Sequence, residues 1–159
     1  MIKFACCIPG GSLMPEGVAE VPASPAEDIV RKCRYLLDIG YDLTECGGGM
    51  LSGLNDEEIK YLTDENSRSS LGLIAVNSMF PGNWRLSDPS SDKEVYLRHA
   101  EKILAIMEKL GAKYAVFGSG AARWLHDDCD SEESRRTLYD FVLRLAALAK
   151  KYGVMLLIE

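Results

Sequence analysis

The sequence predicts an α/β fold with a parallel sheet, because strand-like and helix-like segments alternate along all 159 residues. The predicted strands begin near residues 2, 41, 72, 113 and 154, at spacings of 39, 31, 41 and 41 residues that are typical of βα units. Three predicted helices end at a glycine directly before the next strand, at Gly40, Gly111 and Gly153. Five parallel strands and four helices in sequential order therefore account for residues 1–159 as a single domain.

The first half of the chain is predicted to hold three strands and two helices. Residues 2–7 are a short apolar strand, followed by a loop rich in Gly and Pro. Ser24 and Glu27 form a capping box that begins a helix, with proline at its first position. The remaining elements are a strand over residues 41–45, a glycine loop over 47–49, a helix capped by Asn55 and Glu58, and a strand over 71–77.

The second half repeats the same order with stronger patterns. A capping box at Ser91 and Glu94 predicts a helix that ends at Gly111, and residues 113–117 form the fourth strand. A Gly-Ser-Gly turn follows this strand at residues 118–120. Ser131 is predicted to cap the last helix, whose apolar face has helical spacing and leads to the final strand over residues 154–158.

Five strands in this order fit two architectures. One is the first five-eighths of a (β/α)₈ TIM barrel, with strand order 1-2-3-4-5 and all helices outside. The other is a complete flavodoxin-like sheet, with order 2-1-3-4-5 and helices on both faces. Residues 154–158 are a core strand that delivers Glu159 at its C-terminal end, where parallel α/β enzymes place catalytic groups. We therefore expect the chain to be part of a larger enzyme.

Composition argues against nucleic-acid and membrane partners. The net charge is −6, and no basic run is present to contact a phosphate backbone. No apolar stretch has the length of a membrane span, and the N-terminus lacks the features of a signal peptide. The five cysteines are odd in number and form no Cys-x-x-Cys pair, so neither a disulfide framework nor a zinc site is indicated. We expect a cytoplasmic protein.

Polar residues at the predicted C-terminal strand ends are the candidate site residues. They are the adjacent Cys6 and Cys7, Glu45, Asn77, Ser119 with Arg123 beyond it, and Glu159. The C-terminal ends of parallel strands meet on one rim, so the two carboxylates could ligate a divalent metal or exchange protons with a substrate. The glycine turn and Arg123 could contact a phosphate, although the motif is neither a P-loop nor a dinucleotide fingerprint.

Four segments carry a resemblance to a known family. Residues 111–123 (GAKYAVFGSGAAR) resemble the fourth-strand segment of the sugar phosphate isomerase/epimerase proteins of the xylose isomerase-like TIM-barrel superfamily. Residues 41–45 (YDLTE), 77–82 (NSMFPG) and 156–159 (LLIE) are similar to the second, third and fifth strands of that family. The resemblance spans the chain and favours an incomplete TIM barrel, truncated after strand five.

The resemblance implies a metal-dependent isomerase or epimerase that transfers a proton next to the carbonyl of a small carbohydrate or sugar phosphate. It implies that Glu159 is catalytic and is the first ligand of a divalent metal, most often Mn²⁺ (manganese). It places Glu45, Asn77, Ser119 and Arg123 on the substrate rim. The family's Asp, His and second Glu ligands belong to strands six to eight, which have no counterpart here, so we expect the chain alone to be inactive and to hold metal weakly or not at all.

Three readings stay open on the sequence. The first and favoured one is the N-terminal part of such an isomerase, whose open sheet edges also predict a homo-oligomer. The second is a self-contained flavodoxin-like module that binds a phosphate or a nucleotide without catalysis. The third is a half-barrel whose active site is completed by another chain.

Overall fold

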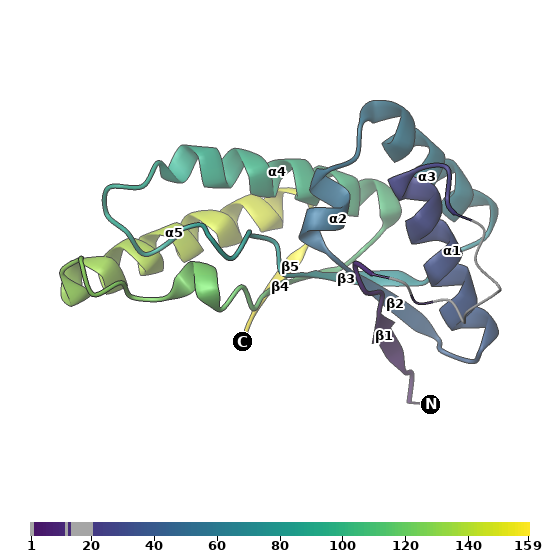
Figure 1. Cartoon of the computed structure of the whole chain (residues 1–159), viewed down its shortest axis with the longest axis horizontal. Helices are drawn as coiled ribbons and strands as arrows, with labels where there is room; N and C mark the ends of the chain where they lie inside the picture. The colour runs from purple at the N-terminus through teal and green to yellow at the C-terminus, as the bar shows by residue number, and fades with distance from the viewer. Residues whose placement is uncertain (1, 12, 14–20) are drawn as a thin grey trace.

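A computed structural model describes residues 2–11, 13 and 21–159 of the chain; part of the predicted Gly- and Pro-rich loop lies outside these residues. Five parallel strands form one sheet in the order β1-β2-β3-β4-β5 (Figure 1). They are β1 (Ala5–Cys7), β2 (Leu43–Gly47), β3 (Leu73–Asn77), β4 (Tyr114–Phe117) and β5 (Met155–Ile158). This sequential order confirms the partial TIM barrel and excludes the flavodoxin-like alternative, which requires β1 between β2 and β3.

The long helices form one layer on one side of the sheet (Figure 1). They are α1 (Pro25–Asp38), α3 (Asp56–Arg68), α4 (Lys93–Leu110) and α5 (Ser131–Lys151). Each contacts the next, α1 with α3, α3 with α4 and α4 with α5, as the helices of a barrel wall do. Within the described residues, no helix is both long enough and apolar enough to cross a membrane.

One helix was not predicted. α2 (Gly48–Ser52) begins where the sequence indicated a glycine loop, directly after Gly47 ends β2. Gly48 is buried in contact with the main chain of Met79, so packing at the first of two flexible glycines favours the helical turn, although Gly49 is exposed. The count of four helices was therefore wrong, because burial overrides the low helix propensity of glycine here.

Two helix caps lie one residue from their predicted positions. Asp92 rather than Ser91 caps α4, and its carboxylate accepts a hydrogen bond from the main chain of Glu94 at 2.9 Å. Asp130 rather than Ser131 caps α5. A carboxylate caps as well as a hydroxyl and also interacts favourably with the helix dipole, which explains the preference. Ser24 and Asn55 cap α1 and α3 as predicted, but the capping box is complete only at Asn55, because Glu27 accepts a hydrogen bond from the N–H of Ala23 at 2.6 Å and not from that of Ser24. The three helix-ending glycines are as predicted, with φ of 108°, 71° and 65° at Gly40, Gly111 and Gly153.

The second strand also begins later than predicted, at Leu43 instead of Tyr41. The N–H of Tyr41 still bonds to the Leu36 carbonyl at 3.0 Å, so residue 41 belongs to the turn that leaves α1, whereas the N–H of Asp42 bonds to the Phe4 carbonyl at 3.0 Å. The strand also ends later than predicted, at Gly47, so Glu45 lies in its middle instead of at its end.

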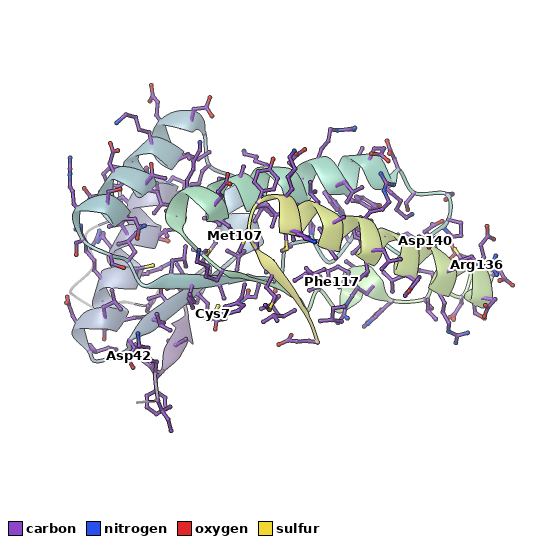
Figure 2. All side chains as sticks on the ribbon, turned by 180° about the vertical axis from the view of Figure 1, so that it is seen from behind. Cys7, Asp42, Met107, Phe117, Arg136 and Asp140 are labelled. Atoms are coloured by element: carbon purple, nitrogen blue, oxygen red, sulfur yellow. The ribbon has the colours of Figure 1, made fainter. Side chains whose placement is uncertain are left out.

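The two faces of the sheet differ in burial. Thr44, Cys46, Val76, Ala115 and Phe117 point toward the helices and are buried, and Met107 of α4 lies between the helix layer and the sheet (Figure 2). Side chains alternate between faces along each strand. The opposite face, called the open face below, therefore carries Cys7, Glu45, Asn77, Tyr114, Met155 and Leu157, of which Met155 is 59% exposed. Most of the described core thus lies between sheet and helices, although Ala75, which pairs with Glu45 on the open face, is also buried.

Candidate functional site

The C-terminal ends of the five strands form one edge of the molecule, called the rim below. The predicted site residues fall into two groups along it. Cys7 and Asn77 lie at the ends of β1 and β3, whereas Ser119, Arg123 and Glu159 lie just beyond β4 and β5. Parallel strands with sequential order bring these positions to the same edge although they are far apart in the chain.

A surface cavity of about 470 Å³ lies at the ends of β1, β2 and β3. The side-chain amide of Asn77 is the main polar group of this cavity. Its Nδ2 donates a hydrogen bond to the Cys7 Sγ at 3.0 Å. An amide that approaches a cavity can donate to a hydroxyl or carbonyl oxygen of a ligand and accept from a hydroxyl. Among the described residues, those that line this β1–β3 cavity are Cys7, Ile8, Pro9, Gly10, Gly47, Gly49, Met50, Asn77 and Ser78.

Ser78 in this cavity has a left-handed backbone, with φ of 46°, which is uncommon outside glycine. Such a conformation costs on the order of 1–3 kcal/mol and is found more often at functional sites. It occurs directly after Asn77, the last residue of β3. No sequence signal distinguishes this serine, so sequence reasoning missed it.

Glu45 lies lower on the open face than predicted. It is half-buried, and its Cα partners in the neighbouring strands are Cys7 and Ala75. Gly47, two residues further, occupies the strand end level with Asn77. Glu45 therefore pairs with Cys7, which lines the β1–β3 cavity, but Glu45 is not among the residues that line it.

Arg123 and Glu159 are brought together at the other end of the rim. Arg123 ends a 3₁₀ turn over Ala121–Arg123, and its Nη1 donates a hydrogen bond to the main-chain carbonyl of Glu159 at 2.8 Å. The guanidinium carbon lies 5.3 Å from the centre of the Phe117 ring, a cation–π distance. Arg123 thus contacts protein groups on two sides.

Ser119 is buried and contacts the neighbouring loop. Its Oγ accepts a hydrogen bond from the main-chain N–H of Phe80 at 3.3 Å, which joins the turn after β4 to the loop after β3. The Phe80 ring lies 5.9 Å from the Phe117 ring and 5.6 Å from the Phe141 ring. The aromatic residues that follow β3 therefore pack as core beneath the rim.

The described residues do not form a complete metal site. Within residues 2–11, 13 and 21–159, no group of three or more His, Cys, Asp and Glu side chains could hold a metal ion. Glu159 supplies a hard oxygen donor suited to Mn²⁺, but a catalytic ion needs at least three protein ligands. Cys46 is no substitute, because burial, with smaller effects of Cys33, Cys7 and Glu45, raises the pKa of its thiol far above its ordinary value.

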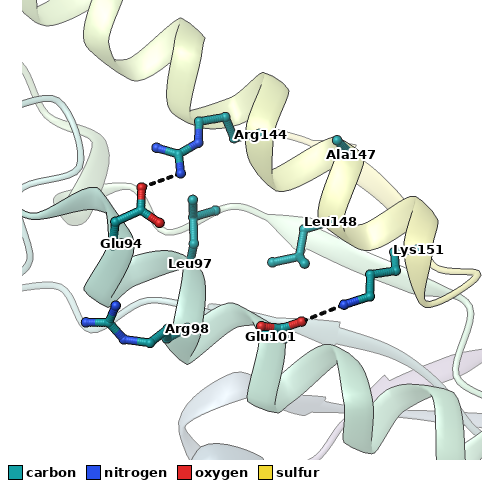
Figure 3. Close-up of a pocket in the computed structure, with 8 residues that line it drawn as sticks. All are labelled: Glu94, Leu97, Arg98, Glu101, Arg144, Ala147, Leu148 and Lys151. Carbon is teal, nitrogen blue, oxygen red and sulfur yellow. Dashed lines mark hydrogen bonds and ion pairs between the residues drawn. The ribbon is translucent and has the colours of Figure 1, made fainter.

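A second hollow, of about 480 Å³, lies on the helix layer between α4 and α5 (Figure 3). Leu97 and Leu148 line it, and ion pairs of Arg144 with Glu94 and of Lys151 with Glu101 cross it. It is formed by the outward sides of two helices and contains none of the candidate site residues. The rim remains the place where chemistry is expected.

Both the sequence and the fold of this chain are similar to those of known proteins. The sequence model described as xylose isomerase-like TIM barrel matches residues 33–159. No curated protein matches the chain significantly.

Three solved structures illustrate the likeness of fold. A 3-keto-D-glucoside 4-epimerase from E. coli has a TM-score of 0.69 and 18% identity, over 99% of this chain and 56% of that one. A D-psicose 3-epimerase from Clostridium cellulolyticum H10, solved with D-tagatose, has a TM-score of 0.66 and 20% identity, over 81% and 45%. An L-ribulose 3-epimerase has a TM-score of 0.62 and 23% identity, over 85% and 45%. The chain spans about half the length of these structures.

Proposed function

Because the chain belongs to the xylose isomerase-like TIM-barrel family, we propose that it forms the first five strands of a sugar or sugar phosphate isomerase or epimerase. Residues 1–159 would be one domain, continued in the complete enzyme by strands six to eight. The observation that carries the proposal is the sequential parallel sheet, whose C-terminal rim holds Asn77 and Glu159. In barrels of this kind the catalytic groups come from that rim.

The proposed substrate is a small carbohydrate with a carbonyl group. Similar folds occur in epimerases of D-psicose and L-ribulose, which supports a ketose or its phosphate as the substrate class. In the proposed reaction the C–H bond next to the carbonyl breaks, its proton passes to a carboxylate, and a proton returns to the opposite face or to the neighbouring carbon.

We propose that Glu159 is a catalytic carboxylate of this proton transfer and that Asn77 forms a hydrogen bond with a substrate oxygen. Glu45 would accept hydrogen bonds from substrate hydroxyls that reach the open face. Ser119 and Arg123 remain predicted substrate-binding residues, but both already bond to protein groups.

A divalent ion, with Mn²⁺ expected, is proposed only for a polypeptide that supplies the further ligands. Glu159 by itself leaves the ion without the three or four ligands that hold it in place. We therefore propose that the isolated chain is inactive.

Self-association and a cytoplasmic location complete the proposal. β1 and β5 are both sheet edges, and the open face exposes Tyr114, Met155 and Leu157. Unpaired edges and apolar surface favour association between copies. All five cysteines are free thiols, which supports a reducing compartment.

Two measurements on the purified chain test the proposal. Epimerisation of D-tagatose, D-allulose, L-ribulose and ketose phosphates should be undetectable with added Mn²⁺, whereas turnover that a chelator abolishes would refute the expected inactivity. In nuclear magnetic resonance (NMR) titrations, a ketose should shift the amide signals of Asn77 and Glu159. The shift at Glu159 should weaken in Glu159→Gln and persist in the control Glu108→Gln, on the exposed side of α4. Shifts confined to other parts of the chain would count against this substrate class.

A further inference from the structure

The space beside Gly118 is occupied by the carboxylate of Glu159. Phe117 and Ile158 are the last paired residues of β4 and β5, so Gly118 stands next to Glu159 across the sheet. A Cβ atom added at Gly118 would lie 2.3 Å from Glu159 Oε2 and 3.3 Å from its Cδ. Heavy atoms do not approach so closely, so any side chain at position 118 would displace the carboxylate.

Space, and not backbone conformation, explains the glycine at this position. The φ of Gly118 lies outside the left-handed region that favours glycine, so its backbone is accessible to other residues. Gly120, two residues later in the same turn, also has an ordinary φ, and its added Cβ would meet nothing closer than 3.9 Å. The close approach is therefore specific to Gly118.

Arg123 restrains the main chain of the same glutamate. Its hydrogen bond to the Glu159 carbonyl is 2.8 Å long, and its guanidinium is supported by the buried ring of Phe117. One loop thus contacts Glu159 twice, at the carboxylate through Gly118 and at the carbonyl through Arg123. A glutamate side chain free in solvent samples many rotamers, and such contacts reduce that freedom before a ligand arrives.

We propose that Gly118 and Arg123 are positioning residues, which hold the Glu159 carboxylate in one orientation over the end of β4. In this role Arg123 affects a substrate through Glu159, in addition to the direct contact proposed above. What Glu159 does for the substrate rests on the proposed function, but the positioning itself does not. Precise placement of a reactive group is worth far more to catalysis than its mere presence.

NMR with ¹³C-labelled glutamate tests the role of Gly118. In the unaltered chain, the Hα atoms of Gly118 should show a nuclear Overhauser effect to the Hγ atoms of Glu159. Gly118→Ala should displace the Glu159 side chain, abolish this nuclear Overhauser effect and shift the Glu159 Cδ resonance. The matched control Gly120→Ala adds the same methyl group to the same turn and should leave the Glu159 resonance unchanged.

Two variants test Arg123. Arg123→Met keeps the stem of the side chain but removes the donor, so the Glu159 amide and Cδ signals should move toward those of an unrestrained glutamate. Arg123→Lys retains one donor and should restore part of the original shift, a rescue that a purely structural role for the stem would not produce. Circular dichroism identifies the folded variants, on which alone the signals are compared.

The possible results separate the two proposals. If folded Gly118→Ala and Arg123→Met leave the Glu159 signals unchanged, the positioning role is wrong. If these variants move the signals while no ketose perturbs Glu159 in the unaltered chain, the positioning stands and the proposed substrate class fails. If ketose shifts are present and are lost in Gly118→Ala but kept in Gly120→Ala, both proposals are supported.

Discussion

Replacing Gly48 with alanine should destabilise the protein, because the first turn of α2 lies against the chain that follows β3. A Cβ at position 48 would lie 2.7 Å from the Met79 Cα and 3.1 Å from the Ile103 Cδ1. Both neighbours are fully buried, and the Met79 carbonyl is tied to the His99 ring at 2.9 Å, so neither can move aside freely. Overpacking of this kind costs about 1–3 kcal/mol.

Gly49 provides the matched control for this prediction. A Cβ at position 49 would meet no atom within 4 Å, and its φ is outside the left-handed region. Alanine in a helix is favoured over glycine by up to about 1 kcal/mol, so Gly49→Ala should be neutral or stabilising.

Urea unfolding followed by circular dichroism would measure both variants against the unaltered chain. The melting temperature should also fall in Gly48→Ala by about 2–4 °C per kcal/mol. Equal stability of Gly48→Ala and the unaltered chain would refute the steric argument. An equal loss in Gly49→Ala would show that the loss does not depend on the contact with Met79. Because Gly49 and Met50 line the β1–β3 cavity, a displaced α2 should also reshape that cavity.

Two further outcomes are expected. Light scattering at micromolar concentration should detect a dimer or larger species. Ile158 lies on the edge strand β5 and is 64% exposed, so Ile158→Lys should shift the chain toward monomer. A monomeric unaltered chain would contradict this prediction. The free energy of unfolding should fall as the pH rises above about 8.5, because burial raises the pKa of Cys46 and the unfolded chain therefore loses that thiol proton first. The free energy of unfolding should change by up to about 1.4 kcal/mol per pH unit. In urea unfolding at a series of pH values, Cys46→Ala should have a shallower slope, and identical slopes would exclude Cys46 as the cause.

The alternation of strands and helices could be predicted because its signals are local. Apolar runs, the Ser24 and Asn55 caps and the glycines that end helices each act within one or two turns of chain. Gly111 illustrates this, since its left-handed φ of 71° was expected from its place between a helical pattern and an apolar run. The order of the strands required the family resemblance, because periodicity alone fitted two sheets.

The sequence predicted that the candidate residues lie at one rim, but it did not predict their contacts. Residues at strand ends identified Asn77 and Glu159, since parallel strands carry their C-terminal ends to one rim. The two-residue shift of β2, which leaves Glu45 in the middle of the strand, was not predicted, and at its start Tyr41 still bonds to Leu36 of α1. This bond belongs to the C-terminal turn of α1, which an apolar pattern typical of a strand does not predict.

By itself, the sequence determined a parallel α/β domain of five strands, the placement of Asn77 and Glu159 at one rim and the absence of a P-loop or dinucleotide motif. Only the tertiary structure decided that Gly48 begins a helix, that Ser119 supports Phe80, and that Gly118 makes room for the Glu159 carboxylate. The physical reason is separation along the chain. Caps and periodicity come from neighbouring residues, whereas the Gly118 and Glu159 contact joins residues 41 positions apart, whose distance is set by how two strands align.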